Sequence, residues 1–182
     1  MSSQHEESAA HSDEPRDAPP YVAVIGPGRA TTDEAAAAER VGALLAQRGA
    51  VVVCGGLGGV MEAVCKGAVR HGGQAIGILP GRDRAAGNRY ASALITTGIG
   101  EARNALVVGA GDAVIAIGGS WGTLSEIGLA LRTGKPAFAL HSWQIDRPGR
   151  ELGAGPVEVA SAEEAVAAVF DALRPGPRAG RA

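Results

Sequence analysis

The hydrophobic positions of the chain fall into short apolar runs that alternate with longer stretches of helical spacing. The runs are continuous and rich in Val, Ile and Ala, which is typical of strands buried on both faces of a parallel sheet. Strands are expected at seven places: 21–25, 50–54, 74–79, 93–97, 113–117, 137–140 and 157–159. Helices are expected between them, at about 32–48, 60–71, 100–108, 124–133 and 162–173. This alternation predicts an α/β fold, a single Rossmann-like doubly wound domain with a mainly parallel sheet of six or seven strands flanked by helices.

The two ends of the chain differ in composition from this patterned region. Residues 1–20 hold five acidic residues and one arginine but no Val, Ile, Leu or Phe, and residues 175–182 form a short basic segment. Segments of such low hydrophobicity bury too little apolar surface to fold. We therefore expect two disordered tails, 1–20 and 175–182, around one nucleotide-binding domain at 21–174.

Charge and cysteine content exclude several classes of protein. The formal net charge of −2 gives no basic surface for nucleic acid, which also disfavours a DNA-handling relative with this fold. No apolar run approaches the roughly 18 residues that span a bilayer, and the polar, acidic start is unlike a signal peptide. Cys54 and Cys65 are too few for a zinc site or a disulfide framework. We expect reduced core thiols in a cytoplasmic protein without nucleic-acid or membrane partners.

The strand expected at 113–117 leads into the most informative stretch of the sequence. Gly118 and Gly119 end the apolar run, a tight loop is expected at 120–123, and residues with helical spacing follow. A glycine-rich turn from a buried strand to a helix N-terminus presents free N–H groups and the positive end of the helix dipole. This arrangement predicts a binding site for phosphate, formed by Gly118, Gly119, Ser120, Trp121, Gly122 and Thr123.

Two further glycine-rich turns follow the first and second strands and belong to the same edge of the sheet. The expected ligand contacts in these turns are Gly26, Gly28, Gly55, Gly56 and Gly59. The first turn resembles part of a dinucleotide-binding fingerprint, but the second strand ends on Cys54 and glycine, without the acid that would hold an NAD ribose. The first turn is therefore either a tight turn alone or a nucleotide or phosphate contact. In the second turn, a run of glycine lets a ligand approach the backbone.

Glu126 and Trp121 each allow two interpretations from the residues alone. Thr123 and Glu126 have the spacing of a capping box, in which Glu126 would accept from the Thr123 N–H. Alternatively, Glu126 is a carboxylate of the site that stabilises positive charge or activates water. Trp121 could stack on a base or sugar, or pack against a partner subunit. No Ser-His-Asp, metal-binding or cysteine-nucleophile arrangement is found, and no metal is expected.

Three segments resemble signatures of the LOG (LONELY GUY) family, whose members were long misnamed lysine decarboxylases. GGSWGTLSE at 118–126 is similar to P-G-G-x-G-T-x-x-E, with Gly118 in the place of Pro and Ser120 in the place of Gly. The second glycine-rich turn resembles G-G-G-x-x-G-L-M. The segment at 100–104 resembles M-H-E-R-K, in which Arg103 matches the Arg and Asn104 replaces the Lys.

The resemblance implies a hydrolase that cleaves the N-glycosidic bond of a purine- or cytokinin-type nucleoside 5′-monophosphate to a base and ribose 5-phosphate. It also implies catalytic roles for Glu126 and Arg103, with Asn104 beside them in the nucleotide site, and neither a cofactor nor lysine decarboxylation. The alternative is a non-catalytic protein that binds a phosphorylated ligand, like the similar molybdenum-cofactor carrier proteins. Few aromatic residues and Ala-rich helices, together with the resemblance, predict a homo-oligomer, either a dimer or a tetramer.

Overall fold

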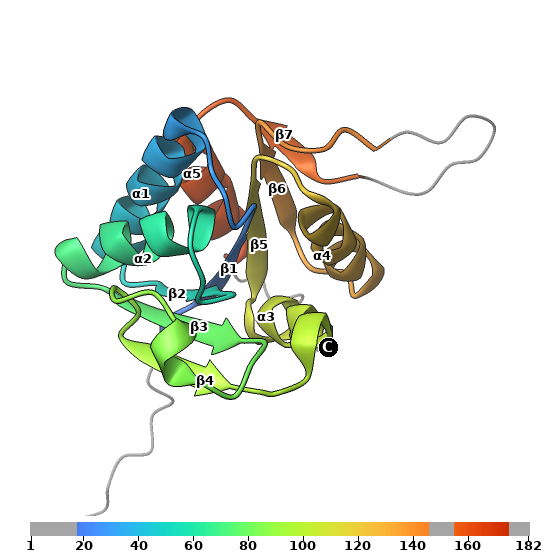
Figure 1. Cartoon of the computed structure of the whole chain (residues 1–182). Helices are drawn as coiled ribbons and strands as arrows, with labels where there is room; N and C mark the ends of the chain where they lie inside the picture. Colours follow the sequence, from blue (N-terminus) through green and yellow to red (C-terminus); the bar gives the residue numbers. More distant parts are fainter. Residues whose placement is uncertain (1–17, 146–154, 175–182) are drawn as a thin grey trace, which may run out of the picture.

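The computed structural model describes residues 18–145 and 155–174 (Figure 1). The expected acidic tail, 1–20, lies outside these ranges except for residues 18–20. The expected basic tail, 175–182, lies outside them entirely. The domain described below therefore corresponds to the predicted folded region apart from residues 146–154.

The core of the fold is one seven-stranded sheet in which every pair of neighbouring strands is parallel. The strands are β1 (Tyr21–Ile25), β2 (Val51–Cys54), β3 (Gln74–Leu79), β4 (Ala93–Thr96), β5 (Ala113–Ile117), β6 (Ala137–Leu140) and β7 (Val157–Val159). Their order is β4-β3-β2-β1-β5-β6-β7. The chain thus winds outward from β1 in one direction and then in the other, which confirms the predicted doubly wound α/β fold.

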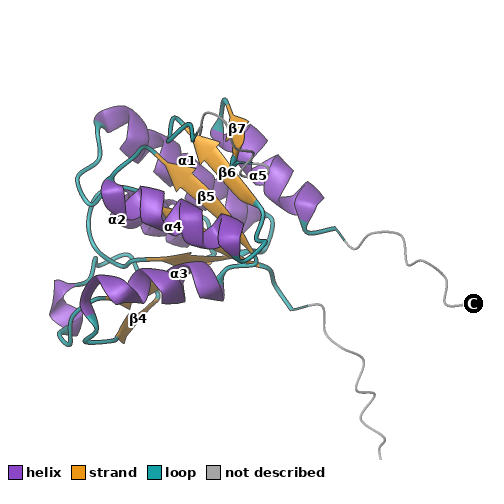
Figure 2. Cartoon of the chain, turned by 90° about the vertical axis from the view of Figure 1, so that its right-hand side faces the viewer, coloured by secondary structure: helices purple, strands orange, loops and turns teal. Residues whose placement is uncertain are grey.

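Helices cover both faces of the sheet, as Figures 1 and 2 show. They are α1 (Thr32–Gln47), α2 (Val60–Arg70), α3 (Asn104–Ala110), α4 (Trp121–Arg132) and α5 (Ala162–Ala172), with 3-10 turns η1 (Arg84–Ala86) and η2 (Gly100–Arg103). Helices α1, α2 and α5 pack on one face, and α3 and α4 pack on the other. Strands β2, β5 and β6 are buried along their whole length because both faces are covered.

The beginnings of two helices differ from the prediction. Helix α4 begins at Trp121, because Ser120 has an extended backbone and its Oγ accepts the Thr123 N–H at 3.3 Å. Most of the expected loop 120–123 is therefore the first helical turn, and the capping box between Thr123 and Glu126 is wrong. The helix expected at 100–108 is a 3-10 turn, η2, followed by α3, which ends at Ala110.

The capping box of α1 and the burial of both cysteines are confirmed. Thr31 and Glu34 form the predicted capping box of α1, with reciprocal hydrogen bonds of 3.2 and 2.8 Å. Cys54 and Cys65 are buried without a disulfide bond, and their Sγ atoms lie 3.5 Å apart. Within the described ranges, no helix combines the length and apolar character needed to cross a membrane.

Candidate functional site

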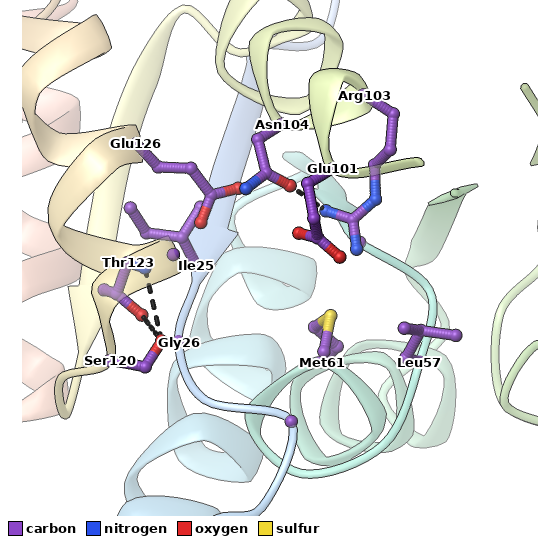
Figure 3. Close-up of a pocket in the computed structure, with 13 residues that line it drawn as sticks. Ile25, Gly26, Leu57, Met61, Glu101, Arg103, Asn104, Ser120, Thr123 and Glu126 are labelled. Atoms are coloured by element: carbon purple, nitrogen blue, oxygen red, sulfur yellow. Dashed lines mark hydrogen bonds between the residues drawn. The ribbon is translucent and has the colours of Figure 1, made fainter. Parts of the chain in front are cut away.

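A cavity of about 210 Å³ lies at the carboxyl ends of β1 and β5, where the winding of the sheet reverses (Figure 3). Ligands of doubly wound sheets bind in this crevice because the neighbouring loops diverge there. The walls come from the turns after β1 and β2, from η2 and the start of α3, and from the start of α4. Segments far apart in the sequence thus meet at one edge, as the sequence predicted for the glycine-rich turns.

Most of the residues expected in the site line this cavity. They are Gly26, Gly28, Gly55, Arg103, Asn104, Ser120, Gly122, Thr123 and Glu126. The two residues with predicted catalytic roles, Arg103 and Glu126, approach the cavity from different elements, η2 and α4. The structure therefore brings together the charged pair that the sequence placed 23 positions apart.

The other expected residues lie beside the cavity and not on its wall: Gly56, Gly59, Gly118, Gly119 and Trp121. At each of these four glycines, an added Cβ would collide with a neighbouring atom of the protein. Gly118 has φ of +63°, and a Cβ there would collide with the Glu34 side chain. A Cβ on Gly119 would lie 2.9 Å from Nε1 of Trp143. The fold alone therefore accounts for glycine at these two positions. Contact of either residue with a ligand stays a prediction.

Four wall residues were not singled out from the sequence: Ile25, Leu57, Met61 and Glu101. Ile25 is the last residue of β1, and Leu57 lies inside the second glycine-rich turn, so proximity to those turns was the available signal. Met61 belongs to the buried core and also borders the cavity. Glu101 lies two positions before Arg103, and its acidic side chain beside an expected cation was the signal for it.

Arg103 is a buried cation that has no carboxylate partner among the residues the structure describes. Its side chain is only 5% exposed, and Nη1 donates to Oδ1 of Asn104 at 2.6 Å. Its Nε is buried without a hydrogen-bond acceptor, and none of the ion pairs within the described residues includes Arg103. Burial of an unpaired charge is costly, so such groups are normally paired. The guanidinium is therefore suited to an anion that enters the cavity.

The space that holds this guanidinium exists because residue 55 is glycine. A Cβ on Gly55 would lie 2.6 Å from Nη2 of Arg103 and 2.7 Å from Nη1. Real Cβ atoms do not approach other atoms so closely, so a side chain at this position must displace the guanidinium. Gly55 thus positions Arg103, which is a different role from the predicted backbone contact with a ligand.

We expect Gly55→Ala to lower the affinity for inorganic phosphate about tenfold, the effect of one lost charge-assisted hydrogen bond. The displaced Arg103 would no longer reach the same point of the cavity. Isothermal titration calorimetry would measure the change. Gly58→Ala is the matched control in the same turn, because its Cβ would meet nothing closer than the Gly28 carbonyl at 3.4 Å. Equal affinities in the two variants would contradict the positioning role of Gly55.

Glu126 is a buried carboxyl group that faces the same cavity (Figure 3). Its residue is 6% exposed, and burial raises its pKa to about 7, although the nearby Arg103 charge opposes the rise and Glu101 adds to it. No hydrogen bond to this carboxyl group is found within the described residues. A carboxyl group that is partly protonated near neutral pH can donate or accept a proton in a reaction.

The N-terminus of α4 adds a second feature that attracts anions. Within the described residues, the backbone N–H groups of Trp121 and Gly122 have no hydrogen-bond partner, whereas the Thr123 N–H is capped by Ser120. Gly122 and Ser120 line the cavity, so the positive end of the α4 dipole lies at its wall. The cavity therefore presents a guanidinium from one side and a helix N-terminus from the other.

Comparisons with known proteins agree with the fold. The model of the SLOG cluster4 family matches residues 19–168. An uncharacterized protein of Archaeoglobus fulgidus is 45% identical over 119 residues, which are 65% of this chain and 78% of that protein.

Two solved structures are similar over most of the chain. One is the molybdenum cofactor binding protein from the phototrophic bacterium Rippkaea orientalis, with a TM-score of 0.78, 34% identity, and coverage of 87% of this chain and 99% of that chain. The other is the molybdenum cofactor carrier protein from Chlamydomonas reinhardtii, with a TM-score of 0.75, 29% identity, and coverage of 86% and 99%.

Proposed function

The chain belongs to the SLOG cluster4 family, and we propose that it is a binding protein for a phosphorylated small molecule, of the kind that carries the molybdenum cofactor. The observation that carries this proposal is the buried Arg103, which forms no ion pair within the described residues and lies opposite the α4 N-terminus. A phosphate group has the charge and the acceptor oxygens that both features require. The phosphate would accept from the guanidinium on one side and from the Trp121 and Gly122 N–H groups on the other.

The two molybdenum cofactor proteins support the choice of cargo. Each resembles this chain over more than four fifths of its length, 87% and 86%. Ligand pockets for molecules of this size commonly measure about 300–1,000 Å³. The cavity of about 210 Å³ is large enough for a phosphate and the atoms next to it, so the rest of such a cargo must extend beyond it.

A second candidate function is the hydrolysis of a nucleoside 5′-monophosphate, as the LOG resemblance implies. Glu126 favours it, because a buried carboxyl group with a pKa of about 7 is suited to stabilise charge on a ribose or to activate water. Asn104 in place of a Lys, and Ala102 in place of a Glu, favour the carrier instead. Nothing in the site suggests lysine decarboxylation, and no resident cofactor is proposed.

One experiment distinguishes the two candidates. Inorganic phosphate, ribose 5-phosphate and GMP are titrated by calorimetry, and each mixture is then followed for released base by chromatography. A carrier binds the phosphorylated compounds and releases no base. A hydrolase releases base and ribose 5-phosphate in equal amounts. If none of the three compounds binds, the proposal of a phosphate site is wrong.

We expect Gly122→Val to block this binding and leave the fold intact. A Cβ on Gly122 would meet only Oγ of Ser120 at 3.7 Å and Nδ2 of Asn104 at 3.9 Å, which are ordinary contact distances, and Gly122 lines the cavity. Affinity for phosphate should fall at least about tenfold, the effect of losing one hydrogen bond to a charged group. The control is Gly128→Val on the same helix, where a Cβ has no neighbour within 4 Å. Retained affinity in the Gly122 variant would place the phosphate elsewhere.

The remaining expectations about partners stay predictions. They are a homo-oligomer, a dimer or a tetramer, and no binding to nucleic acid or membranes. The exposed apolar side chains of Ile95, Ile99 and Leu106 give the homo-oligomer a physical reason, because they lie on the surface around β4 and α3. The cytoplasmic location is likewise a prediction.

A further inference from the structure

Both tryptophans of the chain lie together at the start of α4, the helix whose first turn forms part of the cavity wall. Trp121 is the first residue of α4 and is 78% exposed, which is unusual for so large an apolar side chain. Trp143 follows β6, and the centroids of the two rings lie 5.4 Å apart at an angle of 31°. Only 3% of the residues in this chain are aromatic. Packing within this domain does not explain why the Trp121 indole is so exposed.

Trp143 is anchored to the start of α4, next to the Trp121 ring. Nε1 of Trp143 donates a hydrogen bond of 3.1 Å to the carbonyl oxygen of Ser120, the residue that caps α4. One part of the Trp121 ring contacts Trp143, and the rest remains open. The larger part of the indole surface is therefore free to contact a ligand.

Trp121 also lines a second hollow, of about 700 Å³, which adjoins the cavity. Glu101, Asn104 and Gly122 line both spaces, so the two share one border. A ligand whose phosphate occupies the cavity would therefore pass Gly122 and place its other end beside the indole. The second hollow is large enough for the part of a nucleotide or pterin that the cavity cannot hold.

We propose that Trp121 is a stacking platform for a planar heteroaromatic ring, a purine or a pterin, carried by the phosphorylated ligand. This rests on the proposed phosphate site and assigns the other end of the same ligand. Aromatic side chains stack on the π-face of such rings whatever their hydrogen-bonding pattern. Trp121 therefore supplies affinity for a flat ring, while Arg103 and the α4 N-terminus supply affinity for the phosphate.

The test compares a ligand with a ring, GMP, and a ligand without one, ribose 5-phosphate, in wild type and in Trp121→Ala. We expect the variant to lose about tenfold in affinity for GMP, the usual effect of removing one base–aromatic stack, and to bind ribose 5-phosphate as wild type does. Trp121→Phe should restore most of the loss. Val69→Ala, which truncates another exposed apolar residue (40% exposed) on α2 that lines neither hollow, should change neither affinity.

Intrinsic fluorescence gives an independent measurement, because the chain has only these two tryptophans. GMP should quench the emission more than ribose 5-phosphate at equal occupancy. Unchanged GMP affinity in Trp121→Ala would overturn the platform while ribose 5-phosphate binding still supports the phosphate site. A change of assembly state in Trp121→Ala by light scattering, with both affinities unchanged, would assign Trp121 to a contact between copies and would also overturn it.

Discussion

Replacing Arg103 with methionine should lower the affinity for phosphate about a hundredfold, or about 3 kcal/mol, without lowering the stability of the fold. The guanidinium is the buried positive charge on the cavity wall, and methionine keeps much of its length and apolar packing. The charge has no carboxylate partner within the described residues, so its burial costs free energy in the unliganded protein. The free energy of unfolding should therefore stay the same or rise, measured by urea denaturation.

Two control variants sharpen this result. Arg40→Met removes an exposed arginine that is paired with Glu163 at 2.7 Å, and it should leave phosphate binding unchanged. Arg103→Lys keeps a charge but lacks the planar fork of donors, so its affinity should fall between those of wild type and Arg103→Met. Full phosphate affinity in Arg103→Met would show that this arginine does not hold the anion. A loss of stability with no loss of affinity would assign it a structural role instead.

The sheet could be predicted almost completely from the sequence. Apolar runs such as 113–117, which are short, rich in β-branched residues and bounded by glycine or a charged residue, are typical of strands covered on both faces. The expected and observed bounds of β5 are identical, and those of β2 and β4 differ by one residue. Parallel strands and short turns then place every glycine-rich loop at one edge. The position of the site followed from this topology.

The details of the site could not be predicted because they depend on contacts between distant segments. Ser120 and Thr123 can both cap a helix, and the sequence does not show which one does. Trp143, 23 positions after Ser120, hydrogen-bonds the Ser120 carbonyl and favours the earlier start. Since α4 begins at Trp121, Glu126 lies in its second turn, where it faces the cavity instead of the Thr123 N–H.

The roles of individual glycines could not be predicted either, because they too depend on contacts between distant segments. In the sequence, Gly118 and Gly122 are equivalent members of one loop. In the structure, Gly118 is packed against Glu34 and has a positive φ, whereas a Cβ on Gly122 would meet Ser120 and Asn104 only at ordinary contact distances of 3.7 and 3.9 Å. Only the three-dimensional contacts separate a glycine required by the fold from one that leaves room for a ligand. The LOG resemblance had a similar limit, because it is confirmed at the level of the broader SLOG group, and membership of the LOG family itself is not shown.

Glu126→Gln should make the protein more stable at pH 8 and leave it nearly unchanged at pH 4. In the folded state burial raises the pKa of Glu126 to about 7, from an ordinary value of 4.5. The folded state therefore binds the proton more tightly, and the stability from this group is complete below pH 4.5 and is lost as the pH rises through about 7. The loss amounts to about 3 kcal/mol at most. Glutamine is neutral, like the protonated acid, so the variant does not lose this stability as the pH rises.

The measurement is the free energy of unfolding of wild type and variant from pH 4 to 9. The difference between them isolates Glu126 from the other groups that titrate in this range. Glu164→Gln is the control, because that carboxylate caps α5 at the surface through the Ala160 N–H at 2.8 Å. A difference between wild type and Glu126→Gln that does not change with pH would show that Glu126 keeps an ordinary pKa.

The same variant decides between carrier and catalyst. If Glu126 stabilises positive charge on a ribose, Glu126→Gln keeps its shape and removes the charge, so base release from GMP should fall about a hundredfold or more. Phosphate binding should persist in either case, because Arg103 and the α4 N-terminus provide it. In a carrier, wild type releases no base and the variant binds as well or better, since a negative carboxylate no longer faces the anion. Loss of phosphate binding in Glu126→Gln would contradict both the carrier and the catalyst proposal. It would show that Glu126 itself is required to hold the ligand.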